Sequence, residues 1–263
     1  MAHPQQLQFV RSVSRALSDS YRDLRILEIG SYDVNGEVRK VFEGSSYVGV
    51  DLTEGPGVDV VCEGGTLDHP DASYELSISC ECFEHNPQWV ETLRNMHRMT
   101  RQGGVVLVTC ATTGQLEHGT TRTSPKSSPG TQSVGWDYYL NLTEKDFRRS
   151  LTLDELFEQY FFIKNPYVCD LYFVGIKKGA PRLFDVDLPA LKARALEDQK
   201  KLHEEMLVSQ GGLSLRQQLV RMAFFPVRLA SALPDRTYQG FAHYYVKLLG
   251  LPGKVIRVLV GKA

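Results

Sequence analysis

Side chains that could act as acids, bases or metal ligands lie in two short stretches. Glu81, Glu84 and His85 are spaced as Glu-x-x-Glu-His, and His118 stands in a later polar stretch. Because an imidazole titrates near neutral pH, His118 and His85 are candidate catalytic bases, with Glu84 as a carboxylate that assists them. If residues 81–85 are helical, their three side chains share one face and could bind a divalent ion together with His118. A surface role for His118 and a capping role for Glu84 remain open.

Aromatic and basic side chains occur together in residues 112–142. Trp136, Tyr138 and Tyr139 lie within four positions, and aromatic faces stack on sugar rings and other flat ring systems. Arg122 is a candidate partner for a phosphate or carboxylate. These four residues are the predicted contacts of an acceptor molecule. The aromatic residues could instead anchor the loop, and Arg122 could be solvated.

A third group has the pattern of a nucleoside-binding β-α-β unit. Apolar residues 25–29 lead into Gly30, and a second apolar run ends at Asp51, about twenty residues later. Glycine allows a ligand to approach the backbone, and the Asp51 carboxylate can accept hydrogen bonds from both hydroxyls of a ribose. Because no further glycine follows until Gly36, this is not the turn of a dinucleotide-binding fold.

The order of these motifs resembles that of the class I S-adenosylmethionine-dependent methyltransferases. The resemblance rests on Glu28–Ser31, Asp33–Gly36, Val48–Asp51, Gly55–Val61, Tyr74–Ser79, Glu81–His85 and Arg101–Val108. It covers residues 20–180, and the ordered set is specific although each motif alone is weak. The chain departs from the family at the usual Gly-x-Gly turn, which is replaced by Gly30-Ser31-Tyr32.

The resemblance implies S-adenosylmethionine as the cofactor. By position it implies cofactor contacts from Glu28, Gly30, Ser31, Asp33, Asp51, Leu52, Glu63, Gly64 and Cys80. Some RNA 2′-O-methyltransferases of the wider family hold a divalent metal such as magnesium with the Glu-x-x-Glu-His spacing and a later histidine. Other members that look similar carry the Glu-His pair without a metal, so the metal set Glu81, Glu84, His85 and His118 is one of two alternatives.

The elements expected around these residues form an α/β fold with a doubly wound, mainly parallel, seven-stranded sheet that ends in an antiparallel hairpin. Strands are predicted at 25–29, 46–50, 58–61, 75–79, 104–110, 161–167 and 171–177. A helix over 4–18 is predicted to lie across the sheet edge, and a helix over 88–99 is predicted to be ended by Gly103-Gly104. Residues 143–160 are predicted to be helical in two pieces. Residues 112–142 are expected to be an acceptor lid loop within a catalytic domain of residues 1–180.

The remainder, residues 181–263, is predicted to be a helical, basic extension with a helix over 187–208 broken at Gly211-Gly212. Residues 211–263 hold eight Lys or Arg and one acidic residue, so this segment carries +7 within a chain of net charge −1. We expect either a homodimer contact or a peripheral contact with the inner face of a membrane, and no nucleic-acid partner.

Composition favours a cytoplasmic protein. The chain has 263 residues, 42% apolar and 23% charged, with no visible secretory signal and no apolar run that could span a membrane. Five cysteines, an odd number, mostly in or beside predicted buried strands, indicate a reducing compartment.

The predicted activity is O-methylation of a hydroxyl on a sugar, a glycan or a related polyhydroxylated metabolite. A natural-product phenol or another small molecule is the alternative acceptor. An inactive methyltransferase-fold scaffold is the alternative from another class, and a nicotinamide oxidoreductase is disfavoured by the missing glycines.

Overall fold

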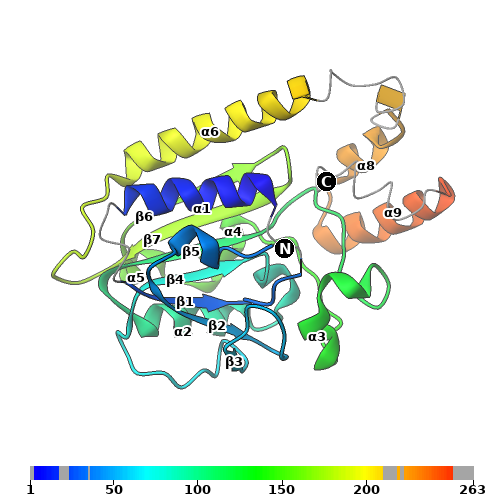
Figure 1. The fold of residues 1–263 in the computed structure, drawn as a ribbon. Coiled ribbons are helices and arrows are strands. Elements are labelled where there is room, and N and C mark those ends of the chain that lie inside the picture. The colour runs from blue at the N-terminus through cyan, green and yellow to red at the C-terminus, as the bar shows by residue number, and fades with distance from the viewer. Residues whose placement is uncertain (1–2, 18–23, 35, 210–217, 220–221, 251–263) are drawn as a thin grey trace.

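The computed structural model describes residues 3–17, 24–34, 36–209, 218–219 and 222–250. Its centre is a seven-stranded sheet in the order β3-β2-β1-β4-β5-β7-β6 (Figure 1). β1 to β5 pair in parallel, and β7 is antiparallel to both β5 and β6. The strands are β1 Arg25–Ile29, β2 Ser46–Asp51, β3 Val60–Val61, β4 Tyr74–Cys80, β5 Thr100–Ala111, β6 Phe157–Asn165 and β7 Asp170–Lys177. The predicted fold class is confirmed.

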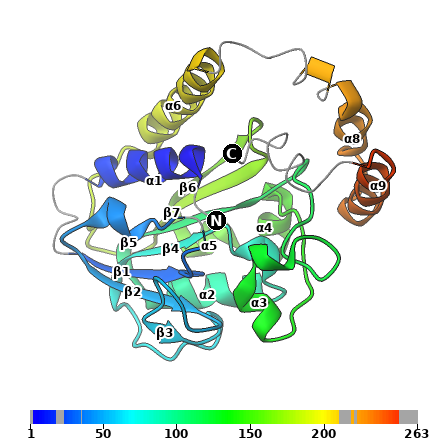
Figure 2. The same ribbon diagram turned by 45° about the vertical axis from the view of Figure 1, so that its right-hand side comes forward.

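Helices cover both faces of the sheet, so the described chain has three layers (Figure 2). On one face lie α1 (Pro4–Ala16) and α6 (Leu188–Ser209), and on the other lie α2 (Trp89–Met99), α4 (Glu144–Ser150) and α5 (Leu153–Leu156). Short helical turns η2 (Arg39–Phe42) and η3 (Phe83–His85) follow β1 and β4. Ile26 is buried with the first set and Leu27 with the second, because successive side chains of a strand point to opposite faces.

The first helix packs on the sheet rather than across its edge. The ring of Phe9 in α1 stacks on the ring of Tyr172 in β7, with centroids 4.4 Å apart. Val10 and Val13 are fully buried in the same cluster. The predicted helix is confirmed but its predicted place at the edge was wrong, since its apolar stripe buries more surface on the face.

Two boundaries also differ from the prediction. α2 ends at Met99 and β5 begins at Thr100, so Gly103 lies inside the strand with φ +70°. The β4–β5 register shifts at this point, as in a β-bulge. β6 begins at Phe157, where a helix was expected; the Phe157 ring packs against Phe173, with centroids 5.2 Å apart, and this tertiary contact outweighs the local helical pattern.

Lys177 at the end of β7 caps the carboxyl end of α2. Its Nζ donates to the carbonyl oxygens of His97 at 2.6 Å, Arg98 at 3.3 Å and Thr100 at 2.7 Å. We expect Lys177→Met to lower the free energy of unfolding by about 1.5 kcal/mol, because three acceptors lose a charged donor. Urea denaturation measures this, with the exposed Lys178→Met as the matched control. Equal stability of the two variants would contradict the capping role.

The remaining helices lie near the carboxyl edge of the sheet. The segment 112–142 contains η4 (Pro125–Ser127) and α3 (Pro129–Ser133). Beyond α6, the described chain contains α8 (Phe225–Ala230) and α9 (Asp235–Leu248), which stand beside the sheet at one end of the molecule (Figure 1). Among the described helices, none combines the length and apolar character needed to cross a membrane. The predicted break at Gly211-Gly212 lies outside the described residues.

Candidate functional site

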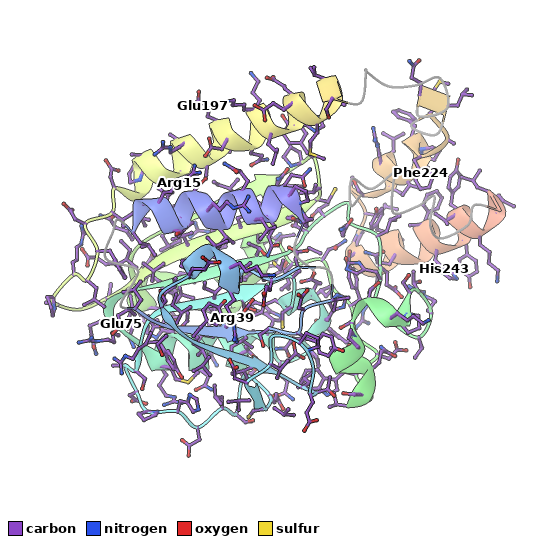
Figure 3. The ribbon with its side chains drawn as sticks, in the orientation of Figure 1. Arg15, Arg39, Glu75, Glu197, Phe224 and His243 are labelled. Atoms are coloured by element: carbon purple, nitrogen blue, oxygen red, sulfur yellow. The ribbon has the colours of Figure 1, made fainter. Side chains whose placement is uncertain are left out.

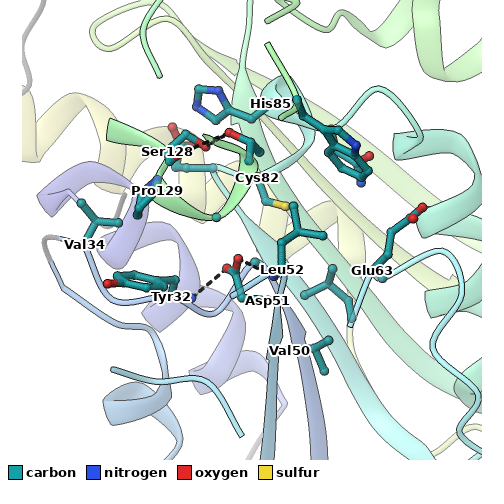
Figure 4. A pocket seen from close by; sticks show the side chains of 18 of the residues that line it. Tyr32, Val34, Val50, Asp51, Leu52, Glu63, Cys82, His85, Ser128 and Pro129 are labelled. Atoms are coloured by element: carbon teal, nitrogen blue, oxygen red, sulfur yellow. Dashed lines mark hydrogen bonds between the residues drawn. The ribbon is translucent and has the colours of Figure 1, made fainter. Parts of the chain in front are cut away.

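A pocket lies at the carboxyl ends of β1, β2 and β4 and encloses about 670 Å³ of empty space, part of it open to solvent (Figure 4). Parallel strands bring the residues that follow them to this one edge. The pocket includes six predicted cofactor contacts: Gly30, Asp51, Leu52, Glu63, Gly64 and Cys80. Tyr32, Val34, Cys82 and Asn86 also line it and were not singled out by the sequence.

Asp51 is held in place by the backbone around it. One carboxylate oxygen accepts from the Tyr32 amide at 3.0 Å and the other from the Leu52 amide at 2.7 Å (Figure 4). Burial raises the pKa of Asp51, and the two amide bonds act against that rise. Each carboxylate oxygen has a second lone pair. Asp51 can therefore accept two ligand hydroxyls at this position.

The pocket has the chemical features that the adenosyl part of S-adenosylmethionine would need. Gly30 has φ +85°, and a Cβ there would lie 2.5 Å from the Cβ of Cys82, so the turn under the pocket requires glycine. Ile29, Val50 and Leu52 give the pocket an apolar side suited to a flat base. A carboxylate next to an apolar wall is the combination that a nucleoside needs.

Part of the segment 112–142 covers this pocket. Residues 127–131 and Trp136 contribute to its lining. Gly130 in α3 packs directly over Asp51, since a Cβ at this position would lie 2.4 Å from a carboxylate oxygen. The segment was predicted to contact the acceptor, and that contact stays a prediction; the structure places part of the segment over the pocket that contains the predicted cofactor contacts. The repeated Ser-Pro of Ser124-Pro125 and Ser128-Pro129 marks the starts of η4 and α3 and was the available signal.

His85, His118 and Tyr139 form one aromatic cluster beside the pocket. Their ring centroids are 4.9 Å apart for His85 and His118, 5.4 Å for His85 and Tyr139, and 5.1 Å for His118 and Tyr139. His85 also lines the pocket. The third predicted catalytic residue, Glu84, is fully buried, with a carboxylate oxygen 4.0 Å from Nε2 of His85. The fold thus brings together all three predicted catalytic residues.

The hydrogen bond of His118 determines which of its nitrogens is basic. Nδ1 lies 3.0 Å from the carbonyl oxygen of Leu116. A carbonyl oxygen only accepts, so in the neutral ring Nδ1 carries the proton and Nε2 is the basic nitrogen. The local geometry is therefore that of an oriented base.

The predicted metal set is assembled only in part. Ligand atoms of Glu84, His85 and His118 lie within 4.8 Å of one another, a separation that one divalent ion could bridge. Glu81 is not among them. Its backbone has φ +52°, and its carboxylate lies near the ligand atoms of His3 and Asp170 instead. The helix assumed over 81–85 was wrong, because the helical turn begins only at Phe83.

Comparison with known proteins agrees with this geometry. Residues 27–108, from β1 to β5, match the family model described as a methyltransferase domain. By this match residues 27–108 are a methyltransferase domain, on a sheet of the type predicted for the class I S-adenosylmethionine-dependent methyltransferases. No curated protein matches the chain significantly.

Solved structures with a similar fold cover the methyltransferase core. One is a Burkholderia thailandensis 1,6-didemethyltoxoflavin-N1-methyltransferase with bound S-adenosylhomocysteine (17% identity, 65% of this chain, 79% of that chain, TM-score 0.44). Another is an S-adenosylmethionine-dependent methyltransferase from Mesorhizobium loti (13% identity, 63% and 96%, TM-score 0.44). A third is the cyclase SpnF (9% identity, 66% and 81%, TM-score 0.46). These similarities carry no information on the acceptor.

The four residues predicted to contact the acceptor do not lie together in one site. Trp136 lines the cofactor pocket, and Tyr139 lies in the histidine cluster with its hydroxyl donating to Asn141 at 3.1 Å. Tyr138 is partly buried away from that lining. The Arg122 guanidinium is paired with Glu117, to which its Nε donates at 3.1 Å. A carboxylate of the protein thus holds the guanidinium predicted to bind an anion.

Three predicted cofactor contacts, Glu28, Ser31 and Asp33, lie outside the pocket lining. The Glu28 carboxylate is buried and accepts from the Tyr47 hydroxyl at 2.8 Å. Burial raises the pKa of Glu28 to about 7, against the opposing effect of the Tyr47 hydrogen bond. The role of these three residues in cofactor binding stays a prediction.

The raised pKa of Glu28 predicts a pH-dependent stability. When the pKa of a carboxyl group is higher in the folded state than in the unfolded state, the group stabilises the folded protein at pH values below its pKa in the unfolded state. This contribution is lost as the pH rises through the folded-state pKa of about 7. Glu28→Gln keeps the acceptor for Tyr47 and removes the titration. From about pH 5 to about pH 8, wild type should therefore lose roughly 2 kcal/mol more unfolding free energy than the variant. Parallel urea titrations at both pH values measure this, and identical pH slopes would show that Glu28 does not titrate there.

The C-terminal helices brace the loop that carries His118. Gln239 in α9 accepts from the Glu117 amide at 2.9 Å and donates to the Gln115 carbonyl at 3.0 Å. The Tyr238 hydroxyl donates to the Gly114 carbonyl at 2.8 Å. Sequence reasoning missed this role of α9, since no local pattern links residues more than one hundred positions apart.

Proposed function

We propose that the methyltransferase domain transfers a methyl group to a hydroxyl of a sugar, a glycan or a related polyhydroxylated metabolite. The observation that supports this reaction is the cluster of His85, His118 and Tyr139 beside the cofactor pocket. An alcohol must lose its proton when its oxygen is methylated, so it needs a positioned base. Trp136 in the pocket wall offers a face on which a sugar ring can stack.

Each residue has a separate task in this proposal. S-adenosylmethionine, when bound, supplies the electrophilic methyl group at the sheet edge. Asp51 holds the ribose hydroxyls, and α3 shields the site from water over Asp51. Nε2 of His118 accepts the proton of the acceptor hydroxyl, while Nδ1 stays bonded to the Leu116 carbonyl. Positioning of the reactants supplies much of the rate, as in any bimolecular transfer.

A metal-assisted form of the same reaction is the second candidate. The observation that favours it is the mutual distance, within 4.8 Å, of ligand atoms from Glu84, His85 and His118. These residues would hold the ion, and its charge would lower the pKa of a coordinated hydroxyl. In this form the histidines act as ligands rather than as proton acceptors.

The test is a transfer assay with methyl-labelled S-adenosylmethionine and a panel of nucleotide sugars, glycans and phenols. Each reaction runs with excess chelator, and again after magnesium or manganese is added back. Methylated sugar hydroxyls formed in chelator support the metal-free proposal, whereas loss in chelator and recovery with the ion support the metal-assisted form. Transfer confined to phenols, or to nitrogen or carbon, would overturn the proposed acceptor.

A further inference from the structure

Exposed apolar side chains are concentrated on α8 and α9. Thirteen large apolar residues are exposed in the described part of the chain, and nine of them lie between residues 208 and 248. Seven of these form what we call the α8–α9 apolar face: Met222, Phe225, Leu229, Leu233, Phe241, Tyr244 and Leu248. Leu229 is 62% exposed and Tyr244 is 72% exposed. Exposed large apolar residues concentrated in one part of the chain favour a contact site there.

The same two helices already use another face for packing. Phe224, Val227, Tyr238 and Ala242 are buried together, with Leu116 against them. In α8 the exposed Phe225 and Leu229 are four residues apart, and in α9 the exposed Phe241, Tyr244 and Leu248 recur at helical spacing. Met222 and Leu233 lie just outside the ends of α8. A surface helix normally places polar residues on the faces that it does not bury. In α8 the exposed apolar side chains lie opposite the buried Val227, and in α9 they lie beside the buried stripe of Tyr238 and Ala242. These additional apolar stripes favour a second apolar environment. Figure 3 labels Phe224 and His243 as guides to the two helices.

Positive charge accompanies the α8–α9 apolar face. Arg228, Arg236 and Lys247 are exposed on the same helices. The single acidic residue of 211–263, Asp235, accepts from the Asn141 amide and the Gln239 side chain. Residues 211–263 carry +7 in a chain of −1. Pairing this face with its own copy would bring these cations together, whereas an anionic lipid surface complements both the charge and the apolar stripe.

We propose that the α8–α9 apolar face docks on an anionic lipid surface. Its apolar side chains enter the interface, and Arg228, Arg236 and Lys247 lie at the level of the headgroups. Because Gln239 in α9 bonds Gln115 and Glu117, docking also holds the loop of the histidine cluster near the membrane. The contact is peripheral, and it goes beyond the proposed reaction because it does not depend on the acceptor.

Vesicle flotation of the full chain tests this proposal. The vesicles are phosphatidylcholine alone and phosphatidylcholine mixed with phosphatidylglycerol, each at low and high salt. We expect flotation only with phosphatidylglycerol, and its loss at high salt. Leu229→Asp should weaken partition by about tenfold or more, and Arg228→Gln by about fivefold. Leu196→Asp is the matched control, an equally charged change at a leucine of α6 that is 45% exposed, and it should float like wild type.

Three results would overturn the proposal of lipid docking. Equal flotation of the Leu229 and Leu196 variants, or no flotation of wild type, overturns the proposal. A dimer seen by light scattering that Leu229→Asp dissociates, without lipid binding, assigns the face to a second copy and overturns it too. Unchanged S-adenosylhomocysteine binding by Leu229→Asp shows that the variant is folded. The flotation result does not depend on methyl transfer, so its failure is distinct from failure of the proposed reaction.

Discussion

Replacing His118 with alanine is expected to lower kcat by about 100-fold or more, because the reaction loses an oriented proton acceptor. The neutral ring directs its basic Nε2 by bonding Nδ1 to the Leu116 carbonyl at 3.0 Å. Affinity for S-adenosylhomocysteine should stay within about threefold of wild type, since His118 lies outside the pocket lining. Steady-state assays at saturating concentrations of the acceptor found by the transfer screen measure kcat, and calorimetry measures the affinity.

His85→Ala and His69→Ala complete this experiment. His69 is the control: its Nδ1 lies 2.6 Å from the hydroxyl of Tyr74, which begins β4, whereas His85 follows the end of that strand. His69→Ala should leave kcat almost unchanged. If His85→Ala abolishes turnover while His118→Ala does not, His85 is the base and the assignment to His118 is wrong. If neither His85→Ala nor His118→Ala lowers kcat, the proposal of general-base catalysis by this cluster is wrong.

Asp51→Ala is expected to weaken cofactor binding by about 2 kcal/mol, or roughly 30-fold in Kd, because the ribose hydroxyls lose a charged acceptor. The carboxylate also bonds the amides of Tyr32 and Leu52, so the alanine variant disturbs the turn as well. Asp51→Asn is a milder change: it keeps one of the two acceptor oxygens of the turn and removes the other together with the charge. It should weaken binding by an intermediate amount. Calorimetric titration with S-adenosylhomocysteine gives both values.

The matched control for these variants is Asp59→Asn. Asp59 also accepts from a backbone amide next to the pocket, that of Gly49 at 2.7 Å, yet it lies outside the lining. Its change should alter Kd by less than about threefold. Wild-type affinity in Asp51→Ala would show that the cofactor does not contact this carboxylate.

The parts of the site that depend on strand ends were predictable. Gly30 follows β1 and Asp51 is the last residue of β2, and parallel pairing of the two strands places both residues at one edge. His85 follows β4 in the same way and also reaches the pocket. Strand periodicity and turn residues are local signals, so they can be recognised in a single sequence without an alignment.

The parts that depend on backbone detail or distant contacts were not predictable. Glu81 adopts φ +52°, which removes it from the face that a helix would have shared with Glu84 and His85. The placement of Gly130 over Asp51 results from the path of a long loop. The hydrogen bond between Gln239 and Gln115 joins two segments, and the local sequence pattern of neither segment indicates this contact. Such features arise from tertiary packing, which a periodic pattern does not encode.

The most direct test of the central assignment is a calorimetric titration of the wild-type chain with S-adenosylhomocysteine and, in parallel, with NAD. An S-adenosylmethionine-dependent methyltransferase with its ribose site at Asp51 should bind S-adenosylhomocysteine at one site per chain with a Kd on the order of micromolar, and should give no heat with NAD. Saturable binding of NAD together with no response to S-adenosylhomocysteine would contradict the assignment.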